Sequence, residues 1–265
     1  MFVSVGAGPT DAKLSQLFVR WALSLASHRS YRDEYSRDYV KNIIGYPKDD
    51  PIYPDLAFSL QMGDLAPAAE VSKSRPIVAI GPIGYFKTDT WPENDATVYE
   101  TYLTKMVLFV DWLIHKGYTI LFIPGEAYYD QLAIHDMKAR LNMGSQSSES
   151  NAIFEASIQT VSDLVSYPHH ANFVVASRFH NILLSQILLK PVLALPYQAK
   201  IDSLMSATDQ GDYCLPVGTF DLATLKQKFE TLAENEGKTP QQPIPHVQRF
   251  QTALQQQYDH IFGIY

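Results

Sequence analysis

The fold is decided by the segment FVVASRFHNILLSQILLKPVLALPYQAK, which runs from Phe173 to Lys200. Its first residues are aromatic or β-branched and predict a strand, and apolar residues at helical spacing from Ile182 to Leu189 predict a helix. A second apolar strand is expected from Pro191 to Leu195. The order strand, helix, strand is typical of a parallel sheet covered by helices.

Positively charged side chains follow both of these strands. Arg178 and His180 stand two residues apart, so an extended backbone would direct both side chains to the same face. The helix that starts near Asn181 would add backbone N–H donors, and Lys200 follows the next strand. Because ligands of open α/β sheets bind beyond the carboxyl ends of the strands, the pattern predicts an anion site. The alternative is that Arg178 and His180 cap carbonyls or pair with acids.

The overall composition requires any such site to be local. The chain has 265 residues, of which 46% are hydrophobic and 12% aromatic, enough for a sizeable core. Its 21 basic and 28 acidic residues give a net charge of −7, which argues against a nucleic-acid or anionic-membrane surface. We therefore expect no nucleic acid among its partners.

Cysteine content and apolar patterning indicate the compartment. A single cysteine, Cys214, allows no internal disulfide and is typical of a reducing compartment. No apolar run reaches the roughly 18 to 20 residues that span a bilayer, and the start of the chain lacks the features of a signal peptide. The eight histidines show no metal-ligand spacing. The sequence predicts a cytoplasmic protein with no membrane span, no metal and no cofactor.

Strands and helices are predicted to alternate along the rest of the chain. We expect strands over 2–5, 76–81 and 118–123, and helices over 14–26, 36–43, 96–115, 129–141, 151–166, 222–233 and 246–262. A Pro-rich stretch over 48–76 indicates a domain boundary near 71–75. We therefore predict a partial N-terminal α/β lobe at 1–72 and a C-terminal Rossmann-like α/β lobe with terminal helices at 73–265. A first lobe this short has few neighbours for its strand, so either another chain completes the sheet or the protein is a shortened version of a longer one.

Four short motifs carry a resemblance to a known family. The segment Val3–Pro9 resembles V-G-x-G-P, Tyr31–Ser36 resembles R-D-x-x-S, and Tyr53–Phe58 resembles P-D-x-x-F. Ser177–His180, with Lys200 twenty residues beyond the histidine, resembles R-x-H and its downstream lysine. With these motifs in this order, the chain resembles the polysaccharide pyruvyl transferase family over most of its length.

The resemblance implies a fold and an activity. Members of that family transfer the enolpyruvyl unit of phosphoenolpyruvate onto a sugar as a ketal, on a two-lobed fold like that of the GT-B glycosyltransferases. It implies α/β architecture with Rossmann-type parallel sheets in two lobes, the N-terminal one truncated here because relatives usually carry a longer segment before the first motif. Arg32, His180 and Lys200 match positions used for donor binding and catalysis. The implied partners are phosphoenolpyruvate and a sugar or lipid-linked glycan acceptor.

The residue types suit this chemistry. Phosphoenolpyruvate carries a carboxylate and a phosphate, and the guanidinium groups of Arg32 and Arg178 can bind such anions through paired hydrogen bonds. Lys200 suits the departing phosphate, and Asn181 marks the start of the helix that adds donors. Ketal formation also needs a group that transfers protons near neutral pH, which is the role we predict for His180. For Arg32 the alternative is a salt bridge to Asp33, Glu34 or Asp38.

Acceptor-binding residues are predicted more weakly. Tyr85 and Trp91 follow the strand at 76–81, where aromatic rings could stack on a sugar, although burial in the core is an equal alternative. Asp130 could assist a sugar hydroxyl, although capping a helix is the more ordinary role for an aspartate there.

Two rival functions fit the same pattern. A nucleotide-sugar glycosyltransferase could hold a diphosphate with R-x-H, but it would also need an acidic residue for the ribose hydroxyls. The candidate, Asp202, lies only two residues after Lys200 and therefore too near the phosphates. The other rival is a non-catalytic remnant that binds a partner. The presence of Arg32, His180 and Lys200 together speaks against such decay.

Overall fold

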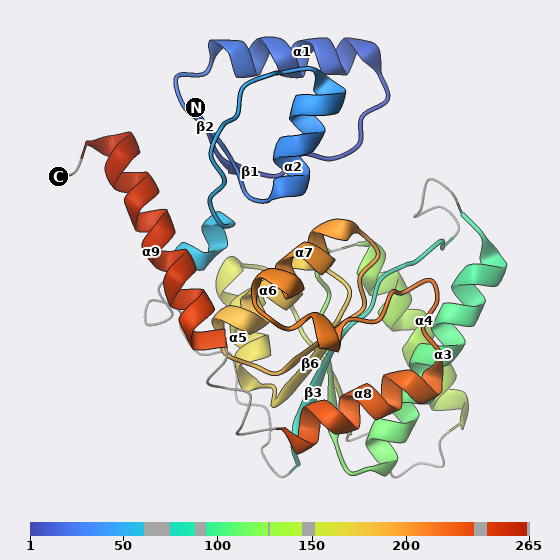
Figure 1. Cartoon of the computed structure of the whole chain (residues 1–265). Helices are drawn as coiled ribbons and strands as arrows, with labels where there is room; N and C mark the ends of the chain where they lie inside the picture. Colours follow the sequence, from blue (N-terminus) through green and yellow to red (C-terminus); the bar gives the residue numbers. More distant parts are fainter. Residues whose placement is uncertain (61–74, 88–93, 127, 145–151, 236–242, 264–265) are drawn as a thin grey trace. The chain divides into compact units, whose positions relative to one another are not determined.

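The computed structural model describes residues 1–60, 75–87, 94–126, 128–144, 152–235 and 243–263. The chain divides into two compact units: unit 1 comprises Met1–Leu60 and Pro245–Tyr265, and unit 2 comprises Gln61–Ile244 (Figure 1). The boundary predicted between residues 72 and 73 lies outside the described residues. The structure groups the last helix with unit 1, whereas the sequence assigned it to the second lobe.

Unit 2 is an α/β domain. Its elements in chain order are β3 (Ile77–Gly81), α3 (Ala96–His115), β4 (Thr119–Phe122), α4 (Tyr129–Gly144), β5 (Ile153–Glu155), α5 (Val161–His170), β6 (Phe173–Ala176), α6 (Phe179–Ile187), β7 (Val192–Ala194), α7 (Ala199–Ala207), η5 (Gly211–Tyr213) and α8 (Leu222–Glu234). The strands form a parallel sheet in the order β5-β4-β3-β6-β7. This confirms the predicted parallel α/β architecture.

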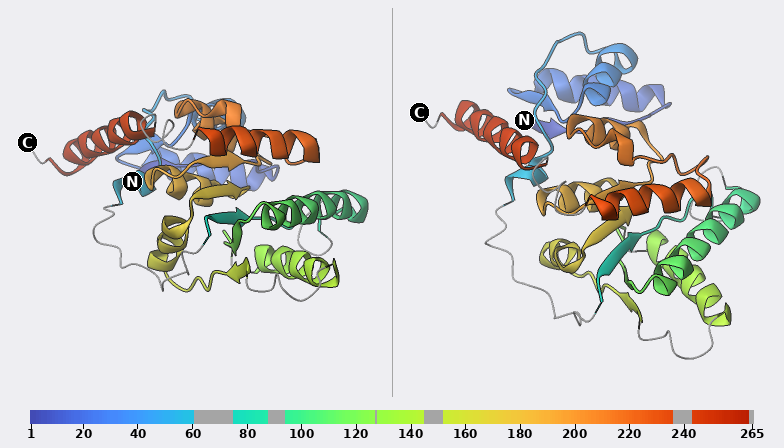
Figure 2. Two further views of the ribbon diagram at one scale, coloured as in Figure 1. Left: turned by 90° about the horizontal axis from the view of Figure 1, so that it is seen from below. Right: turned by 60° about the horizontal axis from the view of Figure 1, so that its bottom comes forward.

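Helices cover both faces of this sheet (Figure 2). Helix α3 packs against α4 and α8, and α5 packs against α6. Every residue of β3, β4, β6 and β7 is buried, which explains why these strands do not alternate and carry a single polar side chain, that of Thr119. Phe109, Phe173 and Phe229 meet in the core between the sheet and α3 and α8.

Several local predictions are confirmed to the residue or nearly so. Helix α3 has the predicted bounds, with Asp95 accepting hydrogen bonds from two backbone amides of its first turn. Gly117 forms the turn into β4 with a φ of 89°, a left-handed value that favours glycine.

Other local predictions are wrong. The helix expected over 151–166 is instead the short edge strand β5 followed by α5, because Thr160 and Asp163 form a capping box that starts the helix only at Val161. Helix α7 was not predicted, although Ile201, Leu204 and Met205 are buried at helical spacing.

Unit 1 is smaller. It contains β1 (Phe2–Val5), α1 (Lys13–Leu25), β2 (Arg29–Tyr31), α2 (Glu34–Tyr39), the π-helical η1 (Val40–Ile44), the 3₁₀ turn η2 (Leu56–Ser59) and α9 (Pro243–Phe262). β1 and β2 pair in parallel, and the unpredicted β2 has only three residues. Asp33 caps α2 and Gly45 ends η1 with a φ of 72°, so the helix expected over 36–43 starts two residues earlier and ends one residue later, with its last part π-helical.

Side-chain contacts within unit 1 explain why the last helix belongs to it. Gln257 of α9 is fully buried and accepts a hydrogen bond from Ser4 Oγ at 3.1 Å, and its amide also donates to Ser30 Oγ. The rings of Phe58 and Phe250 lie 4.8 Å apart. These contacts join the two ends of the chain, which a strictly sequential division cannot represent.

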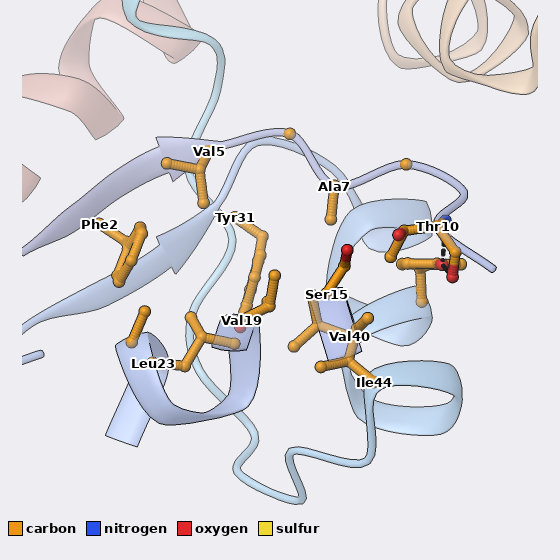
Figure 3. A pocket seen from close by; sticks show the side chains of 14 residues that line it. Phe2, Val5, Ala7, Thr10, Ser15, Val19, Leu23, Tyr31, Val40 and Ile44 are labelled. Atoms are coloured by element: carbon orange, nitrogen blue, oxygen red, sulfur yellow. Dashed lines mark hydrogen bonds between the residues drawn. The ribbon is translucent and has the colours of Figure 1, made fainter. Parts of the chain in front are cut away.

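An apolar pocket of about 480 Å³ lies inside unit 1, between the β1–β2 pair and the helices α1, α2 and η1 (Figure 3). Leu23, Tyr31 and Val40 point into it, and Gly6 to Gly8 border it. The opposite face of α1 exposes Phe18 and Trp21, each 56% accessible. Across the described residues, no helix combines the length and the apolar character needed to cross a bilayer.

Candidate active site

The sheet topology of unit 2 defines where a ligand would bind. The chain passes from β3 through β4 to β5 in one direction and then returns to the other side of β3 for β6 and β7. Strand order therefore reverses between β3 and β6. In open α/β sheets ligands bind beyond the carboxyl ends of the strands at this switch point. Arg178 lies two residues beyond the end of β6, and Gly81 is the last residue of β3.

Arg178 lies at this position but is held by an acid. Its Nε lies 3.1 and 3.0 Å from the two carboxylate oxygens of Asp130, and its Nη2 donates to Oδ1 at 2.7 Å. Nη1 donates to the hydroxyl of Tyr197 at 3.3 Å. Pairing with an acid, the alternative that the sequence left open, is thus found for Arg178. Its role in donor binding stays a prediction.

Asp130 is the buried partner in this pair. The residue has no exposed surface, and its Oδ2 accepts hydrogen bonds from the backbone amides of Gly125 at 3.0 Å and Glu126 at 2.9 Å. Burial raises the pKa of the Asp130 carboxyl above its usual range, while the hydrogen bonds and charge of Arg178 oppose that rise. The pKa of the Arg178 guanidinium is also raised, because the favourable interaction with Asp130 outweighs the effect of burial. Asp130 thus holds Arg178 and the loop after β4.

Two glycines allow this packing. A Cβ placed on Gly125 would lie 2.6 Å from Cγ and 2.7 Å from Cβ of Arg178. A Cβ on Gly81 would lie 2.8 Å from the side-chain nitrogen of Asn181. Both positions need glycine because the chain passes close to these side chains, not because of a positive φ.

Asn181 connects β4 to α6. It is 1% exposed, and its Nδ2 donates to the carbonyl of Ile123 at 3.2 Å. This contact fixes the start of α6 against the carboxyl end of β4. Donor binding by Asn181 stays a prediction.

His180 does not continue the strand, and this corrects the expected geometry. Arg178 is the extended residue immediately before α6, and His180 already lies in the first turn of that helix, where its side chain is exposed. The two side chains therefore do not share a strand face. The helix starts without a side-chain cap among the described residues, which leaves its first-turn amides directed beyond the strand end.

Lys200 lies near the same point. It is in the first turn of α7, and its Nζ is 5.8 Å from the centre of the Phe179 ring. The His180 ring is 5.4 Å from the same Phe179 ring, measured between centroids. Phe179 therefore has the predicted imidazole and the predicted ammonium beside it.

Tyr197 was not identified from the sequence as a site residue. It follows β7, three residues before Lys200, and its ring centre lies 5.8 Å from Cζ of Arg178. Its position just after the end of a parallel strand could have marked it as a candidate, because ligands bind beyond such ends. Tyr85, an expected acceptor contact, is half-buried with its ring 6.0 Å from that of Tyr102, and Trp91 lies outside the described residues.

In unit 1 the three N-terminal motifs meet around Arg32. The Arg32 guanidinium donates to Asp55 at 3.2 Å and lies 3.4 Å from Asp33. A Cβ on Gly6 would lie 2.5 Å from the central carbon of the guanidinium, so this glycine leaves room for the arginine. Ser36 accepts a hydrogen bond from the backbone amide of Ala7 at 2.9 Å. The alternative that the sequence left open for Arg32, a salt bridge to a neighbouring acid, is present with Asp33, and Asp55 adds a second acid from the third motif. Donor binding by Arg32 stays a prediction.

Comparison with solved structures defines the class of fold. The chain aligns with α,α-trehalose 6-phosphate synthase from Burkholderia multivorans at a TM-score of 0.63 and 9% identity, covering 99% of this chain and 65% of that one. A UDP-N-acetylglucosamine 2-epimerase aligns at 0.60 and 13% identity, covering 99% and 66%. Sucrose-phosphate synthase from Thermosynechococcus elongatus aligns at 0.59 and 12% identity, covering 96% and 63%. The fold is GT-B-like, and the chain spans less than two thirds of each of these proteins.

The sequence comparison identifies the family. The family model for polysaccharide pyruvyl transferase matches residues 1–199, which include the first three motifs and the R-x-H of the fourth and end one residue before Lys200. The chain belongs to the polysaccharide pyruvyl transferase family, as the motifs predicted. No curated protein matches the sequence.

Proposed function

We propose that the protein is a pyruvyl transferase that moves the enolpyruvyl unit of phosphoenolpyruvate onto a sugar of a polysaccharide or its precursor as a ketal. The observation that carries the proposal is the grouping of Arg178, His180 and Lys200 at the ends of two adjacent strands, β6 and β7. In a chain of net charge −7, an arginine, a lysine and an imidazole thus follow two neighbouring strands. Family membership supports the same reaction.

The proposed reaction requires proton transfer and charge stabilisation. Two sugar oxygens bond to C2 of the enolpyruvyl group, the methylene carbon gains a proton and becomes a methyl group, and phosphate departs. The protons of the two sugar hydroxyls balance those gained by the methyl carbon and the phosphate. An imidazole can carry such protons near neutral pH, and the exposed His180 is assigned this role.

The cationic side chains are assigned to the two anionic ends of the donor. Lys200 is a compact charge that would stabilise the departing phosphate, a contribution of roughly 3 kcal/mol when water is excluded. Arg178 would contact the donor through the part of its guanidinium that Asp130 does not occupy. The proposed reaction needs no cofactor, because phosphoenolpyruvate is a substrate. The proposed acceptor is a sugar or lipid-linked glycan.

Arg32 is proposed to bind the donor because it matches the family motif, and Gly6→Ala tests it. The added methyl group would displace the flexible end of Arg32, since the Cβ would lie 2.5 Å from the guanidinium carbon. We expect kcat/KM to fall roughly tenfold to a hundredfold, as for a misplaced catalytic group, while the free energy of unfolding falls by about 1 to 3 kcal/mol, as for a methyl group added to a packed site. Steady-state phosphate release and urea unfolding measure the two effects.

Gly8→Ala is the matched control for this variant. A Cβ on Gly8 meets no atom within 4 Å, and the residue belongs to the same turn. Its kcat/KM should stay close to that of the native protein. Equal activity of the two variants would remove Arg32 placement from the proposal.

Ligand-dependent thermal stability tests the choice of donor. Phosphoenolpyruvate at a hundred times its dissociation constant should stabilise the protein by about 2.7 kcal/mol. Uridine or guanosine diphosphate sugars should not. The reverse result would favour a nucleotide-sugar glycosyltransferase, and stabilisation by neither ligand would favour a non-catalytic protein.

Turnover is tested separately from binding. The protein is incubated with phosphoenolpyruvate and a panel of aryl or lipid-linked glycosides, and phosphate release is measured together with the mass of the sugar. Acceptor-dependent phosphate release with a matching mass gain is expected. Binding of phosphoenolpyruvate with no turnover on any acceptor would reduce the proposal to a donor-binding protein.

A further inference from the structure

The Asp130–Arg178 pair leaves little of the guanidinium for a ligand. Nε and Nη2, which form one edge of the group, both bond to the Asp130 carboxylate. Nη1 points toward Tyr197, whose hydroxyl oxygen accepts its hydrogen bond at 3.3 Å. Arg178 therefore cannot present the Nε–Nη2 edge to a substrate while this pair is intact.

Asp130 is itself firmly held. It lies in the first turn of α4, has no exposed surface, and accepts two backbone hydrogen bonds from the loop after β4. A buried carboxylate is stable only with such partners, so its orientation is set by the surrounding backbone. Because Nε and Nη2 both bond to this carboxylate, Asp130 in turn fixes the plane of the Arg178 guanidinium.

Tyr197 lies next to Nη1, the nitrogen of the guanidinium that Asp130 does not bind. A hydroxyl that accepts a hydrogen bond from a guanidinium has its own O–H proton polarised, which makes it a better donor to an anion. The second N–H of Nη1 and the O–H of Tyr197 are neighbours through this hydrogen bond, and such a pair of donors would suit the single negative charge of a carboxylate.

We propose that Asp130 is a positioning residue for Arg178, and that Nη1 of Arg178 and the hydroxyl of Tyr197 together bind the carboxylate of the donor. The identity of that donor rests on the proposed function. The phosphate is left to Lys200, whose Nζ lies beside Phe179. The inference therefore adds Tyr197 as a binding residue and assigns one end of the donor to it.

Binding measurements test the Tyr197 contact. Dissociation constants for phosphoenolpyruvate and for inorganic phosphate are measured by calorimetry on native protein, Tyr197→Phe and the control Tyr213→Phe, whose hydroxyl accepts a hydrogen bond from Asn235. Tyr197→Phe should weaken phosphoenolpyruvate binding by about tenfold or more, as expected for a lost hydrogen bond to a charged group, and leave phosphate binding unchanged. Equal weakening of both ligands, or of neither, would overturn the carboxylate assignment.

Two routes test the positioning role. Asp130→Asn removes the charge that holds Arg178, and Gly125→Ala pushes Arg178 away while keeping Asp130, because the new Cβ would lie 2.6 Å from Cγ of Arg178. Each should weaken phosphoenolpyruvate binding about tenfold, and adding Tyr197→Phe to either should cost little more. Full additivity would show that Asp130 does not act through this contact. Gly211→Ala, whose Cβ would meet only Ser206 at 3.9 Å, is the control for the added methyl group.

A ligand-free readout separates this inference from the proposed function. In native protein with nitrogen-labelled arginine, the Nε–H signal of Arg178, assigned by its loss in Arg178→Lys, should exchange slowly with solvent because Asp130 binds it. Fast exchange in the native protein would overturn the positioning role whatever the substrate is. Slow exchange without phosphoenolpyruvate binding would overturn the proposed function and the carboxylate contact, and would support the positioning role alone.

Discussion

Replacing His180 by alanine is expected to lower turnover with phosphoenolpyruvate and a sugar acceptor by at least about a hundredfold. The imidazole is exposed in the first turn of α6, beyond the carboxyl end of β6. Arg178 and Lys200 remain in the variant, so the dissociation constant for phosphoenolpyruvate should change only a few-fold. Single-turnover phosphate release, measured beside donor binding, distinguishes the chemical step from affinity.

A second exposed histidine of unit 2 provides the control. The side chain of His135 on α4 is 82% exposed, and its replacement by alanine should leave turnover unchanged. Turnover near the native level in His180→Ala would remove this residue from the mechanism.

The local sequence pattern was sufficient for much of the fold. Buried parallel strands are almost continuously apolar, and the caps at Asp33 and Asp95 and the glycine turns at Gly45 and Gly117 are encoded by single residues. The errors arose where two signals overlapped. Between 151 and 166 the apolar spacing suited a helix, but the helix start was determined by the capping pair Thr160–Asp163.

The sequence named several residues of the candidate site, but it named neither Tyr197 nor the contacts between the residues. The motif spacing picked out Arg178, His180 and Lys200, and the structure brings the last two beside Phe179. The pairing of Arg178 with Asp130 joins residues 48 positions apart, and no local periodicity reports such a contact. The assumption of a continuing strand also failed, because the chain becomes helical at Phe179 and turns His180 away from the strand direction.

The glycines also show that the sequence reveals local turns but not contacts between distant segments. Gly6 and Gly125 carry no positive φ, so nothing in a turn pattern marks them as necessary. Each leaves space for an arginine from elsewhere in the chain, Arg32 in unit 1 and Arg178 in unit 2. Their importance is a property of packing, which becomes visible only when the two segments are placed side by side.

The largest effect on stability is expected for Arg178→Met. The variant keeps much of the aliphatic volume of the side chain but leaves the fully buried Asp130 carboxylate without its cation. Removing one partner of a buried pair costs about 3 to 5 kcal/mol, and we expect a loss of this size in the free energy of unfolding near pH 7. Urea denaturation measures it.

The pH dependence of that loss identifies its cause. Burial already raises the pKa of Asp130. In the variant this rise is no longer opposed by the hydrogen bonds and charge of Arg178. A carboxyl whose pKa is higher in the folded than in the unfolded protein stabilises the fold most when protonated, so the variant should be most stable in acid and lose stability as the pH rises through the folded-state pKa. Urea midpoints at about pH 5 and about pH 8 should therefore diverge more in Arg178→Met than in native protein. Adding Asp130→Asn removes the charge, so the double variant should regain most of the stability and lose the extra pH dependence. A deficit that is equal at both pH values and unchanged by Asp130→Asn would mean that Arg178 stabilises the protein through packing alone.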